Sequence, residues 1–242
     1  MDAQALKQHY EAELEARSRP GGGDQRHGRR MFRAMLKACR ALPPCHLEDP
    51  DSAWIWSDLH LGHDNIIRYT NRPFANAPDM DASLYRNWEA TVGPTDALIF
   101  VGDVAMRYAV SDETWQRIRN GRGGSKHLVV GNHDLKGSGS LRVDGFDDIG
   151  SVLYVDGDPP LVFTHIPLTR VPDGCVNVHG HTHDEAPRVS PHINVSVEQL
   201  DYRPVALRRL QRLARRLVAG HYPDCATTLE RIEAVESEDT DQ

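Results

Sequence analysis

The sequence is poor in cysteine and in long apolar runs. Only four of its 242 residues are cysteines, and they show no C-x-x-C pair or zinc-knuckle spacing. This argues against a thiolate metal site and favours free thiols in a reducing compartment. No apolar run approaches the roughly 20 residues that a membrane-spanning helix needs. The sequence therefore predicts no membrane insertion.

An excess of positive charge is also missing. The formal net charge is −7, so the charge of the whole chain does not favour nucleic acid or an anionic membrane as a partner. Residues 1–7 lack the basic segment and the apolar core of a signal peptide. Together these absences predict a cytoplasmic protein.

The chain has the composition of an ordinary globular protein, and its length fits one domain with additions at both ends. Residues 1–50 are predicted to be a helical N-terminal extension, with a helix from about Arg29 to Leu42. Residues 51–206 are predicted to form the main domain. Residues 207–242 are predicted to add C-terminal helices and an acidic tail that pack on the same domain.

Five short apolar runs in the main domain are each followed by polar residues. The runs are Ala53–Trp56, Ala97–Val101, His127–Val130, Leu161–Phe163 and Val176–Val178. Helical patterns lie at 80–92 and 112–120, and an Asp-Gly turn at 156–157 indicates a hairpin. This alternation predicts an α/β fold with two sheets flanked by helices. If the five runs are parallel neighbours, the residues after them meet along one edge of one sheet, where such folds place active sites.

The polar residues after these runs are of the types that bind metal ions. The five groups are Asp58-Leu59-His60, Gly102-Asp103, Gly131-Asn132-His133-Asp134, Thr164-His165 and Gly180-His181-Thr182-His183. Oxygen and imidazole donors without thiolates suit Mn²⁺, Fe²⁺ or Zn²⁺. Taken singly, each residue has an ordinary structural explanation, such as a turn or a helix cap. Their conjunction predicts a two-metal hydrolase.

Two of the groups place candidate ligands two residues apart. If strand geometry persists beyond the first run, Asp58 and His60 point the same way and Leu59 points toward the core. His181 and His183 repeat this spacing, so we expect both pairs to face one site.

These groups resemble the signature blocks of the calcineurin-like metallophosphoesterases, which are D-x-H, G-D, G-N-H-D/E, a lone His after a strand, and G-H-x-H. The resemblance covers roughly residues 53–206, and the blocks occur in family order. The stretches that resemble one bacterial and phage subgroup are Ser57–His63, Asn65–Ile67, Asn71–Phe74, Ile193–Glu198 and Tyr202–Pro204. The resemblance implies a four-layer αββα sandwich of two mixed sheets flanked by helices. It also implies a metal-dependent phosphoric ester hydrolase with two divalent ions.

The resemblance also implies how the ligands are shared. Asp103 would bridge the two ions. Asp58, His60 and His183 would complete one metal site, and Asn132, His165 and His181 would complete the other. We expect Mn²⁺ first, with Fe, Zn, Ni or Co as alternatives. The implied reaction is attack on phosphorus by a hydroxide that bridges the two ions.

The same resemblance gives His133 the role of a general acid that protonates the leaving oxygen, with Asp134 orienting its imidazole. A helix N-cap is the alternative for Asp134. The candidate contacts to the substrate are His63, Arg72, Arg107 and His179. Guanidinium groups fork onto phosphate oxygens, but the two arginines have a surface position as their alternative. Structural use is the alternative for the two histidines.

The residues after Pro204 predict a basic amphipathic helix. Its apolar stripe consists of Leu207, Leu210, Ala214, Leu217 and Val218, and five arginines lie on the other face. We expect the stripe to pack on the core and the arginines to be solvated or paired with acids. Residues 236–242 are predicted to be a disordered acidic tail that can fold back on these arginines.

The expected function is hydrolysis of a phosphate ester, with a preference for diesters because a general acid matters most for poor leaving groups. Cyclic nucleotides, nucleotide-linked metabolites and nucleic-acid ends all suit such a site. One alternative is a nuclease or phosphatase that binds nucleic acid through the basic helix at 207–218. Another is a non-catalytic scaffold on the same fold, which the complete ligand set disfavours.

Overall fold

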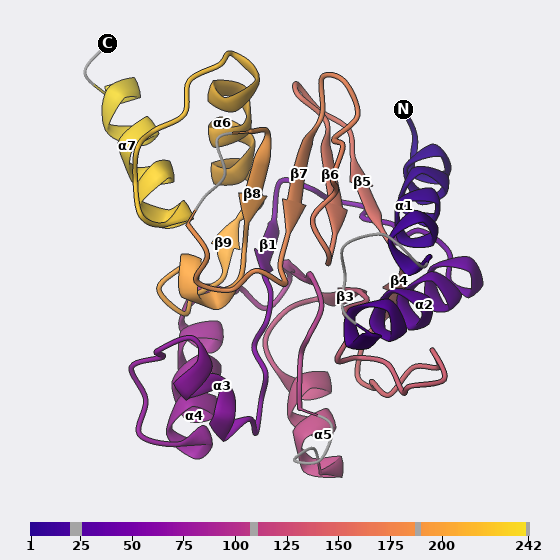
Figure 1. Cartoon of the computed structure of the whole chain (residues 1–242). Helices are drawn as coiled ribbons and strands as arrows, with labels where there is room; N and C mark the ends of the chain where they lie inside the picture. The colour runs from indigo at the N-terminus through magenta and orange to yellow at the C-terminus, as the bar shows by residue number, and fades with distance from the viewer. Residues whose placement is uncertain (20–25, 107–110, 187–189, 241–242) are drawn as a thin grey trace.

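The structure of the protein, a computed structural model, describes residues 1–19, 26–106, 111–186 and 190–240. It is a mixed α/β fold in which two mixed sheets occupy the middle of the molecule and helices flank them (Figure 1). No described helix is long and apolar enough to cross a membrane.

The first sheet has five strands in the order β4-β3-β2-β1-β9. They are β1 (Ala53–Trp56), β2 (Ala97–Phe100), β3 (Ser125–Val129), β4 (Asp148–Gly150) and β9 (Val205–Ala206). The first four are parallel, and β9 pairs antiparallel with β1. β1 has the predicted bounds, because a parallel strand buried on both faces is a continuous apolar run.

The second sheet has four strands in the order β5-β6-β7-β8. They are β5 (Leu153–Val155), β6 (Leu161–Thr164), β7 (Val176–His179) and β8 (His192–Asn194). β5 and β6 form the predicted antiparallel hairpin, and β6, β7 and β8 are parallel. The expectation that all five ligand groups follow strands of one sheet is therefore wrong, because this hairpin begins a second sheet.

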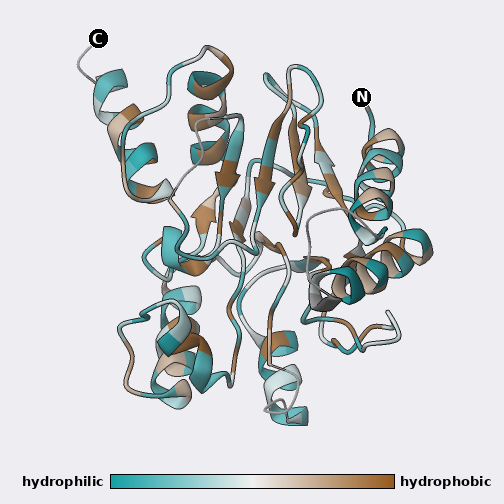
Figure 2. Cartoon of the chain, in the orientation of Figure 1, coloured by the Kyte–Doolittle hydropathy of each residue, from teal (hydrophilic) through white to brown (hydrophobic). Residues whose placement is uncertain are grey.

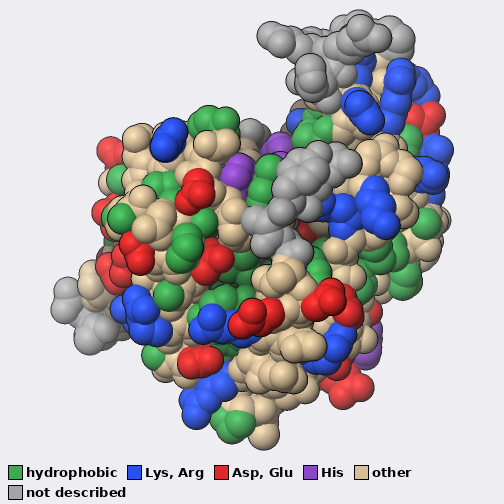
Figure 3. Space-filling view, turned by 90° about the horizontal axis from the view of Figure 1, so that it is seen from below, with side chains coloured by type: hydrophobic (Ala, Val, Ile, Leu, Met, Phe, Trp, Pro, Cys, Tyr) green, Lys and Arg blue, Asp and Glu red, His purple; other side chains and the backbone are tan. Residues whose placement is uncertain are grey.

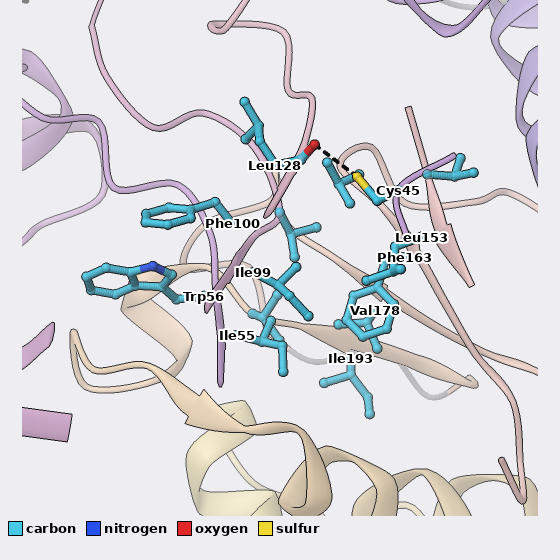
Figure 4. Close-up of a cluster of buried hydrophobic side chains, with 14 of the residues drawn as sticks. Cys45, Ile55, Trp56, Ile99, Phe100, Leu128, Leu153, Phe163, Val178 and Ile193 are labelled. Carbon is cyan, nitrogen blue, oxygen red and sulfur yellow. Dashed lines mark hydrogen bonds between the residues drawn. The ribbon is translucent and has the colours of Figure 1, made fainter. Parts of the chain in front are cut away.

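One apolar core joins the sheets. Ile55 and Ile99 of the first sheet lie near Phe163 and Val178 of the second, and all four are fully buried (Figure 4). On its other face the first sheet packs on helices, where Trp56 meets Trp88 with ring centroids 6.0 Å apart. Figure 2 shows hydrophobic residues in the strands of both sheets, interrupted by hydrophilic ones, and β7 and β8 include the buried polar residues Asn177 and His192.

Seven helices surround the sheets in the described part of the chain. They are α1 (Ala3–Ser18), α2 (Arg26–Ala41), α3 (Asp64–Tyr69), α4 (Ala77–Thr91), α5 (Asp112–Asn120), α6 (Leu207–Val218) and α7 (Thr228–Thr240), with a short 3-10 helix η1 at Val197–Gln199. In Figure 1, α1 and α2 lie on one side of the sheets and α6 and α7 on the other, while α3, α4 and α5 lie below. α1 packs on the segment after β6, where the Glu13 carboxylate accepts hydrogen bonds from the backbone N–H groups of Thr169 and Arg170 at 2.7 and 2.9 Å.

The C-terminal helices correct two predictions. Val218 is 45% exposed because it lies one residue beyond Leu217 and is therefore rotated off the buried stripe; the buried stripe includes Leu213 instead. Residues 236–240 belong to helix α7 and are not a disordered tail. α7 buries Ile232 and Val235 on one side.

The acids of α7 meet the arginines of α6. Glu236 accepts from Arg209 at 2.7 and 2.9 Å, and Asp239 pairs with Arg216 at 2.6 Å. The expectation that acids close by neutralise the basic face of this helix is confirmed for these two arginines.

Candidate metal centre

Backbone strain marks the candidate ligands. Five of them have a left-handed backbone: Asp58 (φ 59°), His60 (φ 51°), Asp103 (φ 54°), His181 (φ 72°) and His183 (φ 47°). Strand geometry therefore does not persist beyond the strands, which corrects the expected alternation, although Leu59 is buried as predicted. A left-handed non-glycine residue costs about 1–3 kcal/mol and persists where the surroundings fix it, typically at functional sites.

One group of candidate ligands consists of Asp58, His60 and His183, whose ligand atoms all lie within 4.8 Å of one another. Asp58 Oδ1 lies 3.9 Å from His60 Nε2 and 3.8 Å from His183 Nε2. Asp58 Oδ1 and His60 Nε2 are both buried without a hydrogen-bond partner. Unpaired buried polar atoms are costly, and a shared cation would satisfy both. This donor set fits a divalent ion.

The rest of the Asp58 carboxylate is fixed by the protein. Its Oδ2 accepts hydrogen bonds from the backbone N–H of His181 and from Ser196 Oγ, both at 2.9 Å. A Cβ on Gly180 would overlap this oxygen, so only glycine permits the approach of the two segments. Oδ1 is thereby turned toward the two imidazoles.

A second group consists of Asp103, His165 and His181. Asp103 Oδ1 lies 3.4 Å from His165 Nε2, and Asp103 Oδ2 lies 3.6 Å from His60 Nε2 of the first group. One carboxylate thus faces both groups. The side-chain oxygen of Asn132 is 3.2 Å from His165 Nε2, next to the second group.

The imidazole of His165 is held in one orientation. Its Nδ1 lies 2.7 Å from the carbonyl oxygen of Val101, so Nδ1–H donates there and Nε2 is left as the ligand atom. Burial lowers the pKa of His165, but the nearby Asp103 carboxylate outweighs burial and raises this pKa to about 10. The centre therefore attracts positive charge strongly.

His133 and His63 lie at the rim of the centre. The half-buried ring of His133 is 4.9 Å from the ring of His60, and its backbone N–H donates to Asp103 Oδ1 at 2.7 Å. His63 Nδ1 is 3.4 Å from His60 Nδ1, and its ring is 6.5 Å from that of His133. His133 also forms a third group of candidate ligands with His60 and Asp103, so geometry alone allows it to ligate an ion.

Asp134 has a different position from the predicted one. Its buried carboxylate accepts hydrogen bonds from the backbone N–H groups of Gly131, Asp103 and Val104 at 2.8, 2.9 and 3.0 Å. Because three backbone donors engage both oxygens, Asp134 ties two ligand-bearing loops together. It forms no hydrogen bond with the His133 imidazole in the described structure.

Arg72 is not placed to clamp a phosphate. It is only 4% exposed, and its guanidinium donates to the carbonyl oxygens of Asp58 and Leu59 at 2.7 and 2.9 Å. It also donates to Glu198 Oε1 at 2.7 and 2.9 Å. These contacts occupy the guanidinium N–H groups that were expected to bind a phosphate of the substrate.

Glu198 is a residue that sequence reasoning missed. Its Oε1 lies 3.1 Å from His183 Nδ1 and also accepts from Arg72. A carboxylate on the second nitrogen of a ligand imidazole fixes the orientation of the ring. The available signal was an acid that directly follows the alternating apolar residues Ile193, Val195 and Val197, where a buried charge needs a partner.

Two other candidate contacts are not confirmed. His179 is 2% exposed, and its ring packs against His192 with centroids 5.6 Å apart. A substrate therefore cannot reach its imidazole, which lies inside the protein at the end of β7. Arg107 lies outside the described residues.

Comparison with known proteins shows the family of this chain but no activity of its members. No family model matches the chain. The uncharacterized protein MJ1445 of Methanocaldococcus jannaschii is 32% identical over 167 residues, which cover 66% of this chain and 89% of that protein. The chain belongs to the same family as MJ1445. The gene 66 protein of Mycobacterium phage L5, also similar to it, is 27% identical over 166 residues, covering 54% of this chain and 77% of its own length.

One solved structure is similar in fold to this chain. The protein of unknown function AQ665 from Aquifex aeolicus matches with a TM-score of 0.53 and 24% identity, over 66% of this chain and 98% of its own. At this identity the likeness concerns the fold alone.

Glu198→Gln is expected to weaken metal binding at the group of Asp58, His60 and His183 by about 10-fold, the lower part of the range for removing the partner of a ligand. Calorimetric Mn²⁺ titration would show one weakened site and one unchanged site. Glu236→Gln is the matched control, since it also removes a carboxylate paired with an arginine, but on helix α7, which contains none of the candidate ligands. Equal affinities in both variants would show that Glu198 does not orient His183.

Proposed function

We propose that the protein is a calcineurin-like metallophosphoesterase with a four-layer αββα architecture, which hydrolyses phosphodiesters with two divalent ions. The observation that carries this proposal is the Asp103 carboxylate, whose two oxygens face two separate groups of buried Asp and His ligands. The unpaired Asp58 Oδ1 and His60 Nε2 support it independently.

The chemistry divides between the ions and the protein. Two divalent ions, when bound, acidify a water and neutralise charge on the phosphoryl oxygens. The protein orients the ligands through Val101, Ser196 and Glu198, and it buries the carboxylates of Asp58 and Asp103 away from bulk water. Oxygen and imidazole donors suit Mn²⁺ first, with Fe, Zn, Ni or Co as alternatives.

His133 is the proposed proton donor to the leaving oxygen. Its backbone is held on both sides, because its N–H donates to Asp103 and its carbonyl oxygen accepts from the Arg142 guanidinium. Its imidazole lies at the half-buried rim next to His60. A proton held there can pass to a substrate oxygen, and this matters most for diesters with alkyl leaving groups, which depart poorly without a proton.

The two alternatives from the sequence receive little support. The arginines of α6 that would bind nucleic acid are partly neutralised by α7. A scaffold that has lost catalysis would not need the two ligand groups, which are complete.

The proposed function is tested with a panel of phosphoesters and divalent metals. After chelation and dialysis, we expect hydrolysis of bis(p-nitrophenyl) phosphate to cease and Mn²⁺ to restore it. We expect the diester to be hydrolysed faster than p-nitrophenyl phosphate. Turnover that survives removal of all metal, or no turnover of any phosphoester with any metal, would refute the proposal.

A further inference from the structure

Two helices of the protein, α2 and α6, are strongly basic, and the acids of α7 pair with arginines of α6 but lie far from α2. α2 contains six arginines and lysines and no acid: Arg26, Arg29, Arg30, Arg33, Lys37 and Arg40. α7 has the opposite character, with five acids and one arginine. α2 and α7 lie on opposite sides of the molecule (Figure 1). A net charge of −7 therefore conceals a strongly basic region.

Three of these residues form a basic stripe, which we define as Arg30, Arg33 and Lys37. They are exposed and spaced three and four residues apart, so they share one helix face. The opposite face, which includes Phe32 and Met35, is buried in the core. Within the described part of the chain, the three stripe residues have no ion pair.

The basic stripe adjoins the candidate metal centre. It lies against residues 135–141, the tight turn that follows His133 and Asp134. A Cβ on Gly137 would lie 3.0 Å from Arg30 Nη2, and one on Gly139 would lie 3.1 Å from Lys37 Cβ. The turn also carries the exposed Lys136. Seen from below, histidine side chains are visible near the upper middle of the molecule, and many Lys and Arg side chains gather at its upper right (Figure 3), on the side where α2 lies in Figure 1.

We propose that the basic stripe binds the phosphate backbone of a nucleic acid and leads it to the metal centre. The proposal rests on the proposed function, because it names the substrate class of that site. From Arg30 to Lys37 the helix rises about 10 Å at 1.5 Å per residue. Each strand of a duplex carries one phosphate per about 3.4 Å of helix axis, so the stripe is as long as about three such steps.

A membrane surface suits the basic stripe less well. A helix that adsorbs to lipid inserts its apolar face, but the apolar face of α2 is buried against the core. The exposed large apolar residues of the described chain are Met1, Tyr69 and Val218, and none belongs to α2. A row of cations without apolar neighbours is typical of backbone binding to nucleic acid.

The test measures binding without turnover. The full-length protein in EDTA is titrated into a fluorescent single-stranded oligonucleotide, and anisotropy is followed at several salt concentrations. The variant is Arg30→Gln/Arg33→Gln/Lys37→Gln. Its matched control is Arg208→Gln/Arg212→Gln/Arg215→Gln, which removes three exposed charges from α6.

We expect the stripe variant to reduce the slope of log affinity against log salt by about 2, since each phosphate contact contributes about 0.7. This corresponds to a roughly 100-fold weaker affinity at 0.1 M salt. The control should retain the affinity of the unmodified protein. Metal uptake, measured on all three proteins, should be equal and would show that the variants are folded.

Three outcomes would overturn the inference. They are equal losses in the two variants, no binding of the oligonucleotide at low salt, and binding to phosphatidylserine vesicles in place of the oligonucleotide. Because hydrolysis is absent from the assay, a protein that binds the oligonucleotide but hydrolyses no ester would refute only the proposed function.

Discussion

Asp103→Ala is expected to lose both metal ions and all hydrolytic activity. The reason is geometric, because Oδ1 of this carboxylate faces His165 while Oδ2 faces His60. Removing the partner of a ligand costs about 10–100-fold in metal affinity, and loss of a shared ligand should exceed this at both sites. Elemental analysis after dialysis should fall from two ions per chain toward none.

Two further variants separate the loss of a ligand shared by both metal sites from the loss of a ligand that belongs to one site. His60→Ala should weaken mainly the site of Asp58 and His183, since the His165 ring stays oriented by the hydrogen bond from its Nδ1–H to the carbonyl oxygen of Val101. Asp103→Asn keeps the shape and can still accept from the backbone N–H of His133. Loss of metal there would therefore reflect lost charge and not a collapsed loop. One ion per chain in the unmodified protein, unaffected by Asp103→Ala, would refute a shared carboxylate.

The parallel strands and the ligand groups could be predicted from the sequence, because both leave a local trace. A strand buried on both faces is a short apolar run, and β1 begins and ends where its run does. α5 also has its predicted bounds, because Ser111 caps it by accepting from the backbone N–H of Thr114. The polar groups that follow the strands then meet, although they come from two sheets.

The roles of the charged residues around the ligands could not be predicted. Arg72 donates to Glu198, which is 126 residues away in the sequence, and no local pattern distinguishes this contact from a phosphate. Asp134 follows a candidate general acid in the sequence, but its carboxylate accepts hydrogen bonds from backbone N–H groups of two loops. Residues 236–240 of α7 were expected to be a disordered tail because of their acids, whereas arginines 23 and 27 residues away pair with these acids.

The left-handed ligands are a further case. The spacing of Asp58 and His60 suits an extended strand, yet both residues adopt φ near 50–60°. Hydrogen bonds between segments impose this geometry: the backbone N–H of Asp58 donates to Gly102 and that of His60 to Asp103. Sequence spacing therefore selected residues that do lie together, but for a conformation that they do not adopt.

His133→Ala is expected to retain both ions and to lose about 10²–10⁴-fold in turnover of a diester with an alkyl leaving group. The loss should shrink greatly for p-nitrophenolate, which departs without a proton. The physical reason is that the imidazole supplies a proton at the rim, while its backbone N–H supports Asp103 in either variant. Rates on both leaving groups and metal content are measured on the same samples.

His63→Ala is the matched control, because it also removes a rim imidazole close to His60. It should affect good and poor leaving groups alike, since its ring is not the proposed donor. The third ligand group, of His60, Asp103 and His133, makes the metal analysis decisive. If an ion leaves with the His133 imidazole, that residue is a ligand. If both ions stay but the loss is the same for alkyl and nitrophenyl esters, His133 positions the substrate and does not protonate its leaving oxygen.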